Sequence, residues 1–267
     1  MQEQFLNENT GIPPLGAKRL STPPLGVRAT IATGLDCVAI IPARGGSKRI
    51  PRKNIKDFLG KPIIAYSIEA ALKSGIFAEV MVSTDDEEIA EIAKKYGASV
   101  PFLRSKENSN DFATTIDVLV EVLTYYQSKS SPTGGGGGCC CIYPTAPFIT
   151  PEILQKSYQM LQNEGFDSVY PVQKFSFPPQ RSVVFEGNKL RWQSPENALV
   201  RSQDLTPMYH DAGQFYFFKT DKFLENRSIL TNNTSGIIIS EMDAHDIDNE
   251  EDWQVAEFKY RLKYENL

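Results

Sequence analysis

Residues 37–54 read CVAIIPARGGSKRIPRKN, and this stretch decides the fold class of the chain. Its first six residues form a short apolar run that ends at Pro42, as expected for a strand covered on both faces of a sheet. A loop rich in glycine, arginine and lysine follows at once. In open α/β sheets, ligands bind beyond the carboxyl ends of the strands, so we expect this loop to take part in binding.

Strand-like and helical patterns alternate along the first two thirds of the chain. Further strands are predicted over 79–83, 99–102 and 139–143, and helices over 63–74, 86–96, 114–127 and 151–164. Thr84 and Asp85 are the candidate caps of the second helix. The alternation predicts an α/β fold with a Rossmann-like, mostly parallel sheet and helices on both faces.

The pattern changes after Ser168. Strands are predicted over 168–172, 181–185, 189–192, 213–218 and 236–240, and a last helix over 249–264. Glu186-Gly187-Asn188 is a predicted hairpin turn. We interpret 173–212 as a small antiparallel lobe on the main sheet, within one domain over 37–267.

Two segments lack any apolar period. Residues 1–36 are rich in Pro, Gly, Thr and Asn, and we expect a disordered extension without a structural role. A shorter product without this extension would need an unusual start, because the next methionine, Met81, lies inside the predicted fold. Residues 128–138, SKSSPTGGGGG, are predicted to be a flexible surface connection.

Composition excludes several classes of protein. The net charge of −5 argues against a global surface for nucleic acid. Cys139, Cys140 and Cys141 are adjacent, so on a strand they point to opposite faces and make a poor disulfide or metal set. These cysteines fit a reducing cytoplasm. No stretch of 18 apolar residues occurs, so we expect no membrane span.

The loop after the first strand is strongly cationic. Six of the 28 Lys and Arg residues lie between positions 44 and 56, and none of the 33 acidic residues does. Glycine lets backbone N–H groups approach phosphate oxygens, and Arg and Lys neutralise them. The loop lacks the Gly-Lys-Ser/Thr of a Walker loop and the third glycine of a dinucleotide fingerprint. A polyanion site is the favoured interpretation; a solvated basic loop or a nuclear-type signal is the alternative.

The sequence of this loop resembles a known signature. Residues 40–51 with Lys53-Asn54 are similar to the motif of the cytidylyltransferases that activate sialic acids, the CMP-sialic acid synthetase family. The segments that follow in the family's order are 82–85, Arg104 with Asp111 and Thr114-Thr115, 143–148, 211–216 and 245–248. The resemblance covers about residues 37–264. Tyr-Pro-Thr-Ala-Pro-Phe at 143–148 and Asp-Ala-Gly-Gln-Phe-Tyr at 211–216 resemble the pseudaminic acid branch.

The resemblance implies a fold of the nucleotide-diphospho-sugar transferase type and a reaction. CTP and a 2-keto sugar acid would give a CMP-sugar and pyrophosphate, and positioning and charge neutralisation would dominate catalysis. The implied partners are these two small molecules and a second copy of the chain, because relatives are commonly homodimers in which the 173–212 lobe reaches across the interface.

The resemblance also assigns roles. Arg44 and Lys53 would be catalytic, stabilising the triphosphate and the leaving pyrophosphate. The residues implied to bind the nucleotide are Ala43, Arg44, Gly45, Ser47, Lys48, Lys53, Asn54, Arg104, Asp111 and Thr114. Among them, Arg104 and Asp111 would form the cytosine pocket, with a surface ion pair as the alternative. Arg49, Arg52 and Lys56 are interpreted as surface charges.

The candidate metal ligands are Asp246 and Asp248. With Ile247 between them, both carboxylates would face one side of a strand and suit Mg²⁺, a hard cation; helix capping by Asp248 is the alternative. The candidate sugar contacts are Tyr143, Asp211 and Gln214.

Three other functions remain open. A cytidylyltransferase acting on neuraminate, legionaminate or a Kdo-type sugar would share the fold. A nucleotide-binding regulator would keep the basic loop without needing the aspartate pair. An RNA-binding protein is disfavoured by the acidic charge and the lack of a base-stacking aromatic motif.

Overall fold

The structure of the chain is a computed structural model that describes residues 37–129 and 137–265. The predicted extension over 1–36 and most of the predicted connection over 128–138 lie outside these residues. No helix in the described ranges is long and apolar enough to cross a membrane.

The central sheet is mixed. Its hydrogen-bonded order is β11 (Thr234–Ile238), β6 (Ser168–Lys174), β10 (Phe215–Lys219), β5 (Gly138–Ile142), β1 (Val38–Pro42) and β4 (Glu79–Ser83), with β9 (Tyr209–Asp211) also paired to β6. β1 runs parallel to β4 and to β5, with Ile40 opposite Met81 on one side and Cys141 on the other. β10 is antiparallel to β5 and β6, and β11 is parallel to β6. The mostly parallel core is therefore confirmed.

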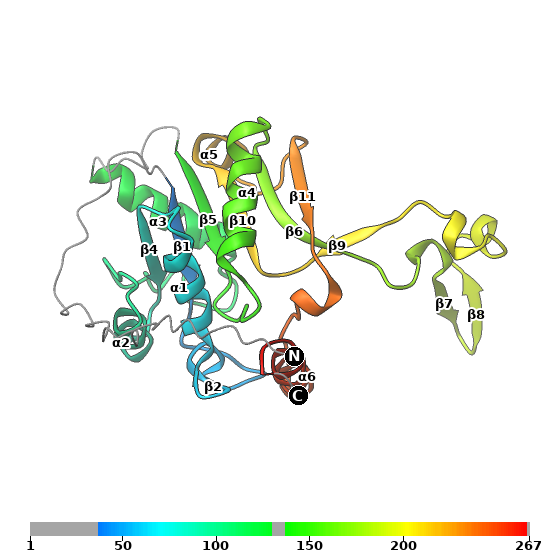
Figure 1. The fold of residues 1–267 in the computed structure, drawn as a ribbon, viewed down its shortest axis with the longest axis horizontal. Coiled ribbons are helices and arrows are strands. Elements are labelled where there is room, and N and C mark those ends of the chain that lie inside the picture. Colours follow the sequence, from blue (N-terminus) through cyan, green and yellow to red (C-terminus); the bar gives the residue numbers. More distant parts are fainter. Residues whose placement is uncertain (1–36, 130–136, 266–267) are drawn as a thin grey trace, which may run out of the picture. The chain divides into compact units, whose positions relative to one another are not determined.

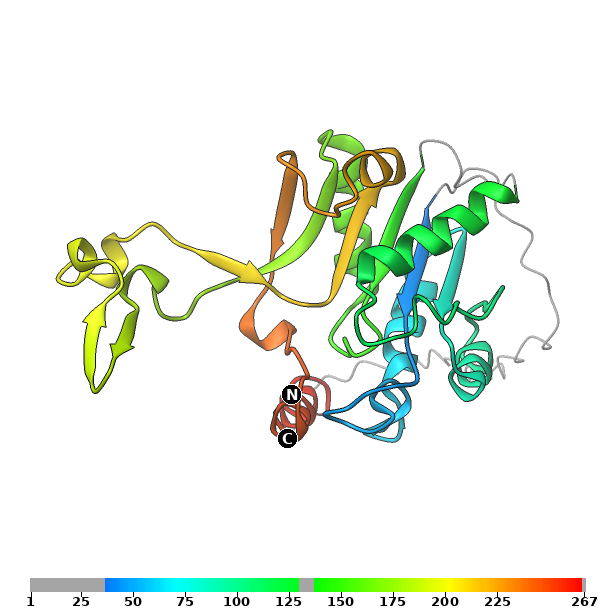
Figure 2. The same cartoon turned by 180° about the vertical axis from the view of Figure 1, so that it is seen from behind.

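Helices cover both faces of this sheet. The α-helices of the described ranges are α1 (Ile63–Ser74), α2 (Glu87–Lys95), α3 (Thr115–Ser128), α4 (Pro151–Asn163), α5 (Thr220–Asn226) and α6 (Glu250–Tyr264). Figure 1 shows α1 and α4 in front of the strands, and Figure 2, from behind, shows α3 on the opposite face. The predicted helices are thus present, with bounds within about two residues, the usual uncertainty of helix ends.

Alternation along each strand builds two cores. Cys140 faces the core that α1 and α4 cover, whereas Cys139 and Cys141 face the core beneath α3. All four cysteines are buried and free. Burial raises the pKa of the Cys141 thiol to about 12, so it stays protonated at neutral pH. These thiols therefore act as small apolar core residues, as the predicted alternation requires.

A third core joins the basic loop to the C-terminal helix. Phe58 lies in a short hairpin of β2 (Asp57–Phe58) and β3 (Lys61–Pro62), and its ring packs edge-on against Trp253 of α6 at 5.6 Å between centroids. Ile50 and Ile247 belong to the same cluster and are fully buried. Apolar packing therefore brings the loop after β1 next to the segment before α6.

The predicted lobe contains a separate hairpin. β7 (Val183–Glu186) and β8 (Lys189–Trp192) pair only with each other among the described strands (Figure 1). Glu186 pairs with Lys189, so Gly187 and Asn188 form the predicted turn, with Gly187 at a φ of 61°. The short 3₁₀ turns beside it are η3 (Pro179–Arg181), η4 (Pro195–Asn197) and η5 (Ser202–Asp204). The predicted strand over 181–185 begins at Val183 because η3 precedes it.

Several local predictions were wrong. The predicted strand over 99–102 is only one bridge, between Ser99 and Met81. The cap of α2 is Asp86, whose side chain accepts the Ile89 N–H at 3.0 Å, rather than Thr84 or Asp85. Neither β9 nor α5 was predicted, since each is short and depends on its contacts with the sheet.

Candidate functional site

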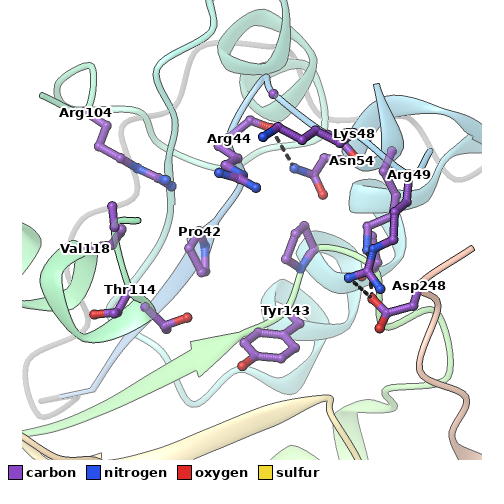
Figure 3. A pocket seen from close by; sticks show the side chains of 17 residues that line it. Pro42, Arg44, Lys48, Arg49, Asn54, Arg104, Thr114, Val118, Tyr143 and Asp248 are labelled. Atoms are coloured by element: carbon purple, nitrogen blue, oxygen red, sulfur yellow. Dashed lines mark hydrogen bonds and ion pairs between the residues drawn. The ribbon is translucent and has the colours of Figure 1, made fainter. Parts of the chain in front are cut away.

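A pocket of about 480 Å³ opens where β1 and β5 end. Pro42 at the end of β1, Tyr143 just after β5, and Thr114 before α3 all line it (Figure 3). The basic loop and the segment before α6 complete the walls through Arg49 and Asp248. The pocket thus lies at the sheet edge where parallel α/β sheets bind ligands.

The basic loop supplies one wall. The guanidinium of Arg44 donates to the carboxylate of Asp111 at 3.1 Å, and the ammonium of Lys48 lies 2.5 Å from the same carboxylate. Buried Asn54 donates its amide N–H to the carbonyl oxygen of Arg44 at 2.9 Å. Asn54 therefore holds the loop in shape, while Arg44 and Lys48 face the pocket (Figure 3).

The segment before α6 supplies the facing wall. The guanidinium of Arg49 contacts the carboxylate of Asp248 at 2.9 Å (Figure 3), and the ammonium of Lys53 lies 4.0 Å from that carboxylate. The Lys53 ammonium also donates to the carbonyl oxygen of Ile247 at 2.7 Å. Cations and an acid from distant parts of the chain thus meet at one pocket.

Asp246 lies beside this wall rather than in the pocket lining. Burial, and next the neighbouring carboxylate of Asp248, raise the pKa of Asp246, while Lys53 opposes them. A side chain at Gly213 would place its Cβ 3.6 Å from the Asp246 carboxyl carbon, and Gly213 has a φ of 64°. The positive φ therefore favours glycine at this position, which lies next to Asp246.

The two aspartates fit a hard divalent cation. Burial and the neighbouring carboxylate of Asp248 make ionised Asp246 costly, and a positive ion held by the two carboxylates would offset that cost. No cluster of three or more His, Cys, Asp or Glu ligands occurs among the described residues. Carboxylate oxygens are the kind of ligand that a hard cation such as Mg²⁺ prefers.

Arg104 forms the inner wall near α3. It is 7% exposed, and its guanidinium donates to the hydroxyl of Ser83 at 3.0 Å and to the carbonyl oxygen of the same residue. Burial lowers the pKa of Arg104. Thr114 caps α3 by accepting the Asp117 N–H at 3.2 Å, and it also lines the pocket. A rigid buried donor beside a helix start is suited to reading a planar polar group.

A chain of hydroxyl groups leads from the pocket to Asp211. The Tyr216 hydroxyl donates to the carboxylate of Asp211 at 2.7 Å, and the rings of Tyr216 and Tyr143 are 5.4 Å apart. Burial raises the pKa of Tyr143. Tyr143 lines the pocket, so its phenol is the end of this chain that a ligand can reach.

The predicted residues fall into two groups. The members that line the pocket are Arg44, Ser47, Lys48, Lys53, Asn54, Arg104, Thr114, Tyr143 and Asp248. The others lie around it and are Ala43, Gly45, Asp111, Asp211, Gln214 and Asp246.

Most residues of the second group already make hydrogen bonds within the protein. Ala43 is fully buried, and its N–H donates to the carbonyl oxygen of Ser83 at 2.9 Å. The Gly45 N–H donates to the carboxylate of Asp85 at 2.9 Å. Buried Gln214 donates to the carbonyl oxygen of Asp243 at 2.6 Å and lines a separate pocket of about 260 Å³.

The sequence interpretation missed three pocket residues that have polar side chains. Arg49, interpreted as a surface charge, lines the pocket, as do Thr115 and Thr145. Thr115 and Thr145 both lie in motifs quoted for the family, which was the available signal. Arg52 and Lys56 do pair outside the pocket, with Asp86 and Glu250 respectively.

The sheet, the cationic loop and the facing carboxylates define a nucleotide-binding α/β protein of the nucleotidyltransferase class. The family model described as "Cytidylyltransferase" matches residues 38–261. The chain therefore belongs to the cytidylyltransferase family.

Individual relatives agree with this assignment. The chain is 42% identical over 230 residues to a pseudaminic acid cytidylyltransferase of Campylobacter jejuni, covering 86% of this chain and 98% of that protein. It is 33% identical over 233 residues to a CMP-N,N'-diacetyllegionaminic acid synthase of Legionella pneumophila, with 86% and 98% covered.

The fold has solved counterparts. A CMP:2-keto-3-deoxy-manno-octonic acid synthetase, solved in complex with CTP, superposes with a TM-score of 0.61 at 21% identity, covering 86% of this chain and 99% of that chain. At this identity the likeness shows the shared nucleotidyltransferase fold.

Proposed function

We propose that the protein transfers the cytidylyl group of CTP to pseudaminic acid, a nonulosonic acid, and releases pyrophosphate. The anomeric hydroxyl oxygen of the sugar attacks the α-phosphorus, the bond from that phosphorus to the β-bridging oxygen breaks, and the hydroxyl proton is lost to solvent or a base. One geometric observation supports this chemistry most: Arg44 and Lys53 of the basic loop line one pocket together with Asp248, which is distant from both in the chain.

The cationic wall would bind the triphosphate. Arg44 and Lys48 now hold the carboxylate of Asp111, an anion in the position where phosphate oxygens would compete for them. Lys53, between the two walls, would offset charge on the departing pyrophosphate. Holding the triphosphate in position and neutralising its charge would provide most of the transition-state stabilisation that phosphoryl transfer needs from a protein.

We also propose Mg²⁺ at Asp246 and Asp248. When bound there it would neutralise phosphate charge. Two hydrogen bonds hold the backbone of the aspartate segment in place. Lys53 donates to the carbonyl oxygen of Ile247, between the two aspartates, and Asp252 accepts the Asp248 N–H at 2.9 Å.

Base and sugar recognition follow from the remaining walls. Arg104 would donate to the cytosine carbonyl edge, since its buried guanidinium is held by Ser83. Tyr143 would contact the sugar, with Asp211 acting through Tyr216. The identity to the Campylobacter relative favours pseudaminate, and the legionaminate relative supplies the second candidate substrate.

We propose a homodimer assembled through the hairpin lobe. Phe185 is 76% exposed and Leu190 60% exposed on paired strands, and Phe177 nearby is 58% exposed. Apolar side chains gathered in this way mark interaction surfaces. A Phe185→Glu, Leu190→Glu variant should sediment as a monomer, whereas Glu186→Lys should not change the mass of the assembly.

The domain boundaries and the location are proposals as well. We take 37–267 as one nucleotidyltransferase domain, with 173–212 as its dimerisation and substrate lobe. Four free, buried cysteines suit the reducing cytoplasm, where CTP is made.

A substrate panel tests the function. Pyrophosphate release is measured with the four nucleoside triphosphates, each combined with pseudaminate, legionaminate or N-acetylneuraminate. We expect efficient release from CTP with pseudaminate alone. Preference for UTP defeats the cytidylyl assignment, and preference for legionaminate replaces the proposed sugar. CTP binding without release in any combination would favour a non-catalytic regulator.

A further inference from the structure

Arg52 belongs to the basic loop but does not line the pocket. Instead, both terminal guanidinium nitrogens donate to the carboxylate of Asp86, Nη2 at 3.0 Å, and Nη2 also donates to Glu88 at 2.5 Å. The paired, two-pronged geometry is the strong form of an Arg–carboxylate contact. The start of α2 thus binds the basic loop at a point outside the pocket.

The backbone of Arg52 needs such a grip. Its φ of 56° and ψ of 29° are left-handed, a conformation that residues with a Cβ rarely adopt without support from their surroundings. Arg52 is also the cap of the 3₁₀ turn η1 (Lys53–Ile55), and its carbonyl oxygen accepts the Ile55 and Lys56 N–H groups at 3.0 Å. Its conformation therefore sets the direction in which Lys53 leaves the loop.

Asp86 also lies close to the other end of the loop. A Cβ at Gly45 would lie 2.7 Å from the Asp86 carboxylate, so only glycine fits against it. The adjacent Asp85 accepts the Gly45 N–H at 2.9 Å. Asp86 itself is fixed as the cap of α2, so a rigid helix start contacts the neighbours of both Arg44 and Lys53.

We propose that Arg52 and Asp86 form a positioning pair, which orients Arg44 and Lys53 toward the triphosphate without touching it. The inference rests on the proposed function, because it assigns the pair an effect on CTP. Hydrogen bonding from Arg52 holds the pKa of Asp86 below its ordinary range, so the carboxylate is ionised at neutral pH.

Two variants separate this role from helix capping. Asp86→Asn keeps a good helix cap but removes the charge that Arg52 grips. Arg52→Gly removes the guanidinium and accepts the left-handed backbone without strain. In both, we expect the KM for CTP to rise about tenfold, equivalent to about 1.4 kcal/mol of binding, with the KM for the sugar acid changed less than about twofold.

The matched control is Glu91→Gln, which breaks a 2.9 Å ion pair with Lys94 on the same helix, away from the loop. It should leave both KM values and the melting temperature unchanged. An unchanged KM for CTP in both Asp86→Asn and Arg52→Gly overturns the proposal. A rise shared by Glu91→Gln overturns it too, because the effect would then belong to α2 in general.

Hydrogen exchange tests the same idea without turnover. In the nucleotide-free protein, Asp86→Asn should speed amide exchange in residues 43–56 and leave the core of α1 unchanged, and exchange equal to wild type overturns the proposal. If the wild-type protein releases no pyrophosphate from CTP, the proposed function fails. The exchange result then decides the positioning role by itself.

Discussion

Lys53 donates a 2.7 Å hydrogen bond from its ammonium group to the main-chain carbonyl of Ile247, 194 positions further along the chain. Burial lowers the pKa of Lys53, while Asp248 and Asp246 act to raise it. The bond fixes the distance between the cationic loop and the aspartate pair. Lys53 is thus both a pocket cation and a tie between the two walls.

Replacing Lys53 should damage activity and stability together. Lys53→Met should lower kcat/KM for CTP at least about a hundredfold, because the pocket loses a cation that would face the triphosphate. It should also cost about 1–3 kcal/mol of unfolding free energy, since the Ile247 carbonyl loses its donor. Steady-state kinetics and urea titration measure the two effects.

The control is Lys56→Met in the same loop. Lys56 pairs with Glu250 and lies outside the pocket lining, so its loss should leave kcat/KM for CTP within about twofold of wild type. Equal losses in the two variants would show that general loop charge, rather than the contact to Ile247, sustains activity.

The aspartate pair should matter for turnover more than for nucleotide binding. Asp246→Asn with Asp248→Asn should retain CTP binding at reduced strength in calorimetry and lose pyrophosphate release. The reason is that amides keep the shape of the wall but hold a divalent cation poorly. Unchanged turnover would remove the metal proposal.

Asp111 offers a test between two interpretations. If it competes with phosphate for Arg44 and Lys48, Asp111→Asn should bind CTP about as tightly as wild type, or up to about fivefold more tightly. If it belongs to the cytosine pocket, the same variant should lose the preference for CTP over UTP. The contacts at 3.1 and 2.5 Å favour the first outcome, and binding of both nucleotides measures it.

Ile247 should be important for stability. It is fully buried in the cluster with Phe58 and Trp253, so Ile247→Ala should cost about 2–5 kcal/mol of unfolding free energy. Val255, on the exposed side of α6, is the comparison: Val255→Ala should stay within about 0.5 kcal/mol. Similar losses for both would mean that the third core is not packed as described.

Stability should fall in acid partly through Asp86. Because Arg52 depresses the pKa of Asp86 in the folded state, the pair stabilises the fold fully above the unfolded value, about 3.9. That contribution is lost as pH falls through the lower folded value. Asp86→Asn should therefore show a shallower loss of stability below about pH 4 in urea titrations across pH. A slope equal to that of wild type would contradict this.

Local patterns were enough to predict most of the fold. β4 and α1 have the predicted bounds, because an unbroken apolar run and a 3.6-residue period are written into neighbouring residues. The strand expected over 99–102 is reduced to one bridge between Ser99 and Met81, because the length of a strand depends on pairing with a partner that no local window contains.

The amino-acid sequence alone determined the chemical types at the site: a cationic glycine loop after a buried strand, and two aspartates separated by one residue. Only the tertiary structure decided which of them meet. In the folded chain, Arg49 lines the pocket and pairs with Asp248, and Gln214 lines a neighbouring pocket. Arg52 pairs with Asp86, the cap of α2. The physical reason is that charge and periodicity are properties of short segments, whereas a 2.7 Å contact across 194 positions requires the packed cores to bring the segments together.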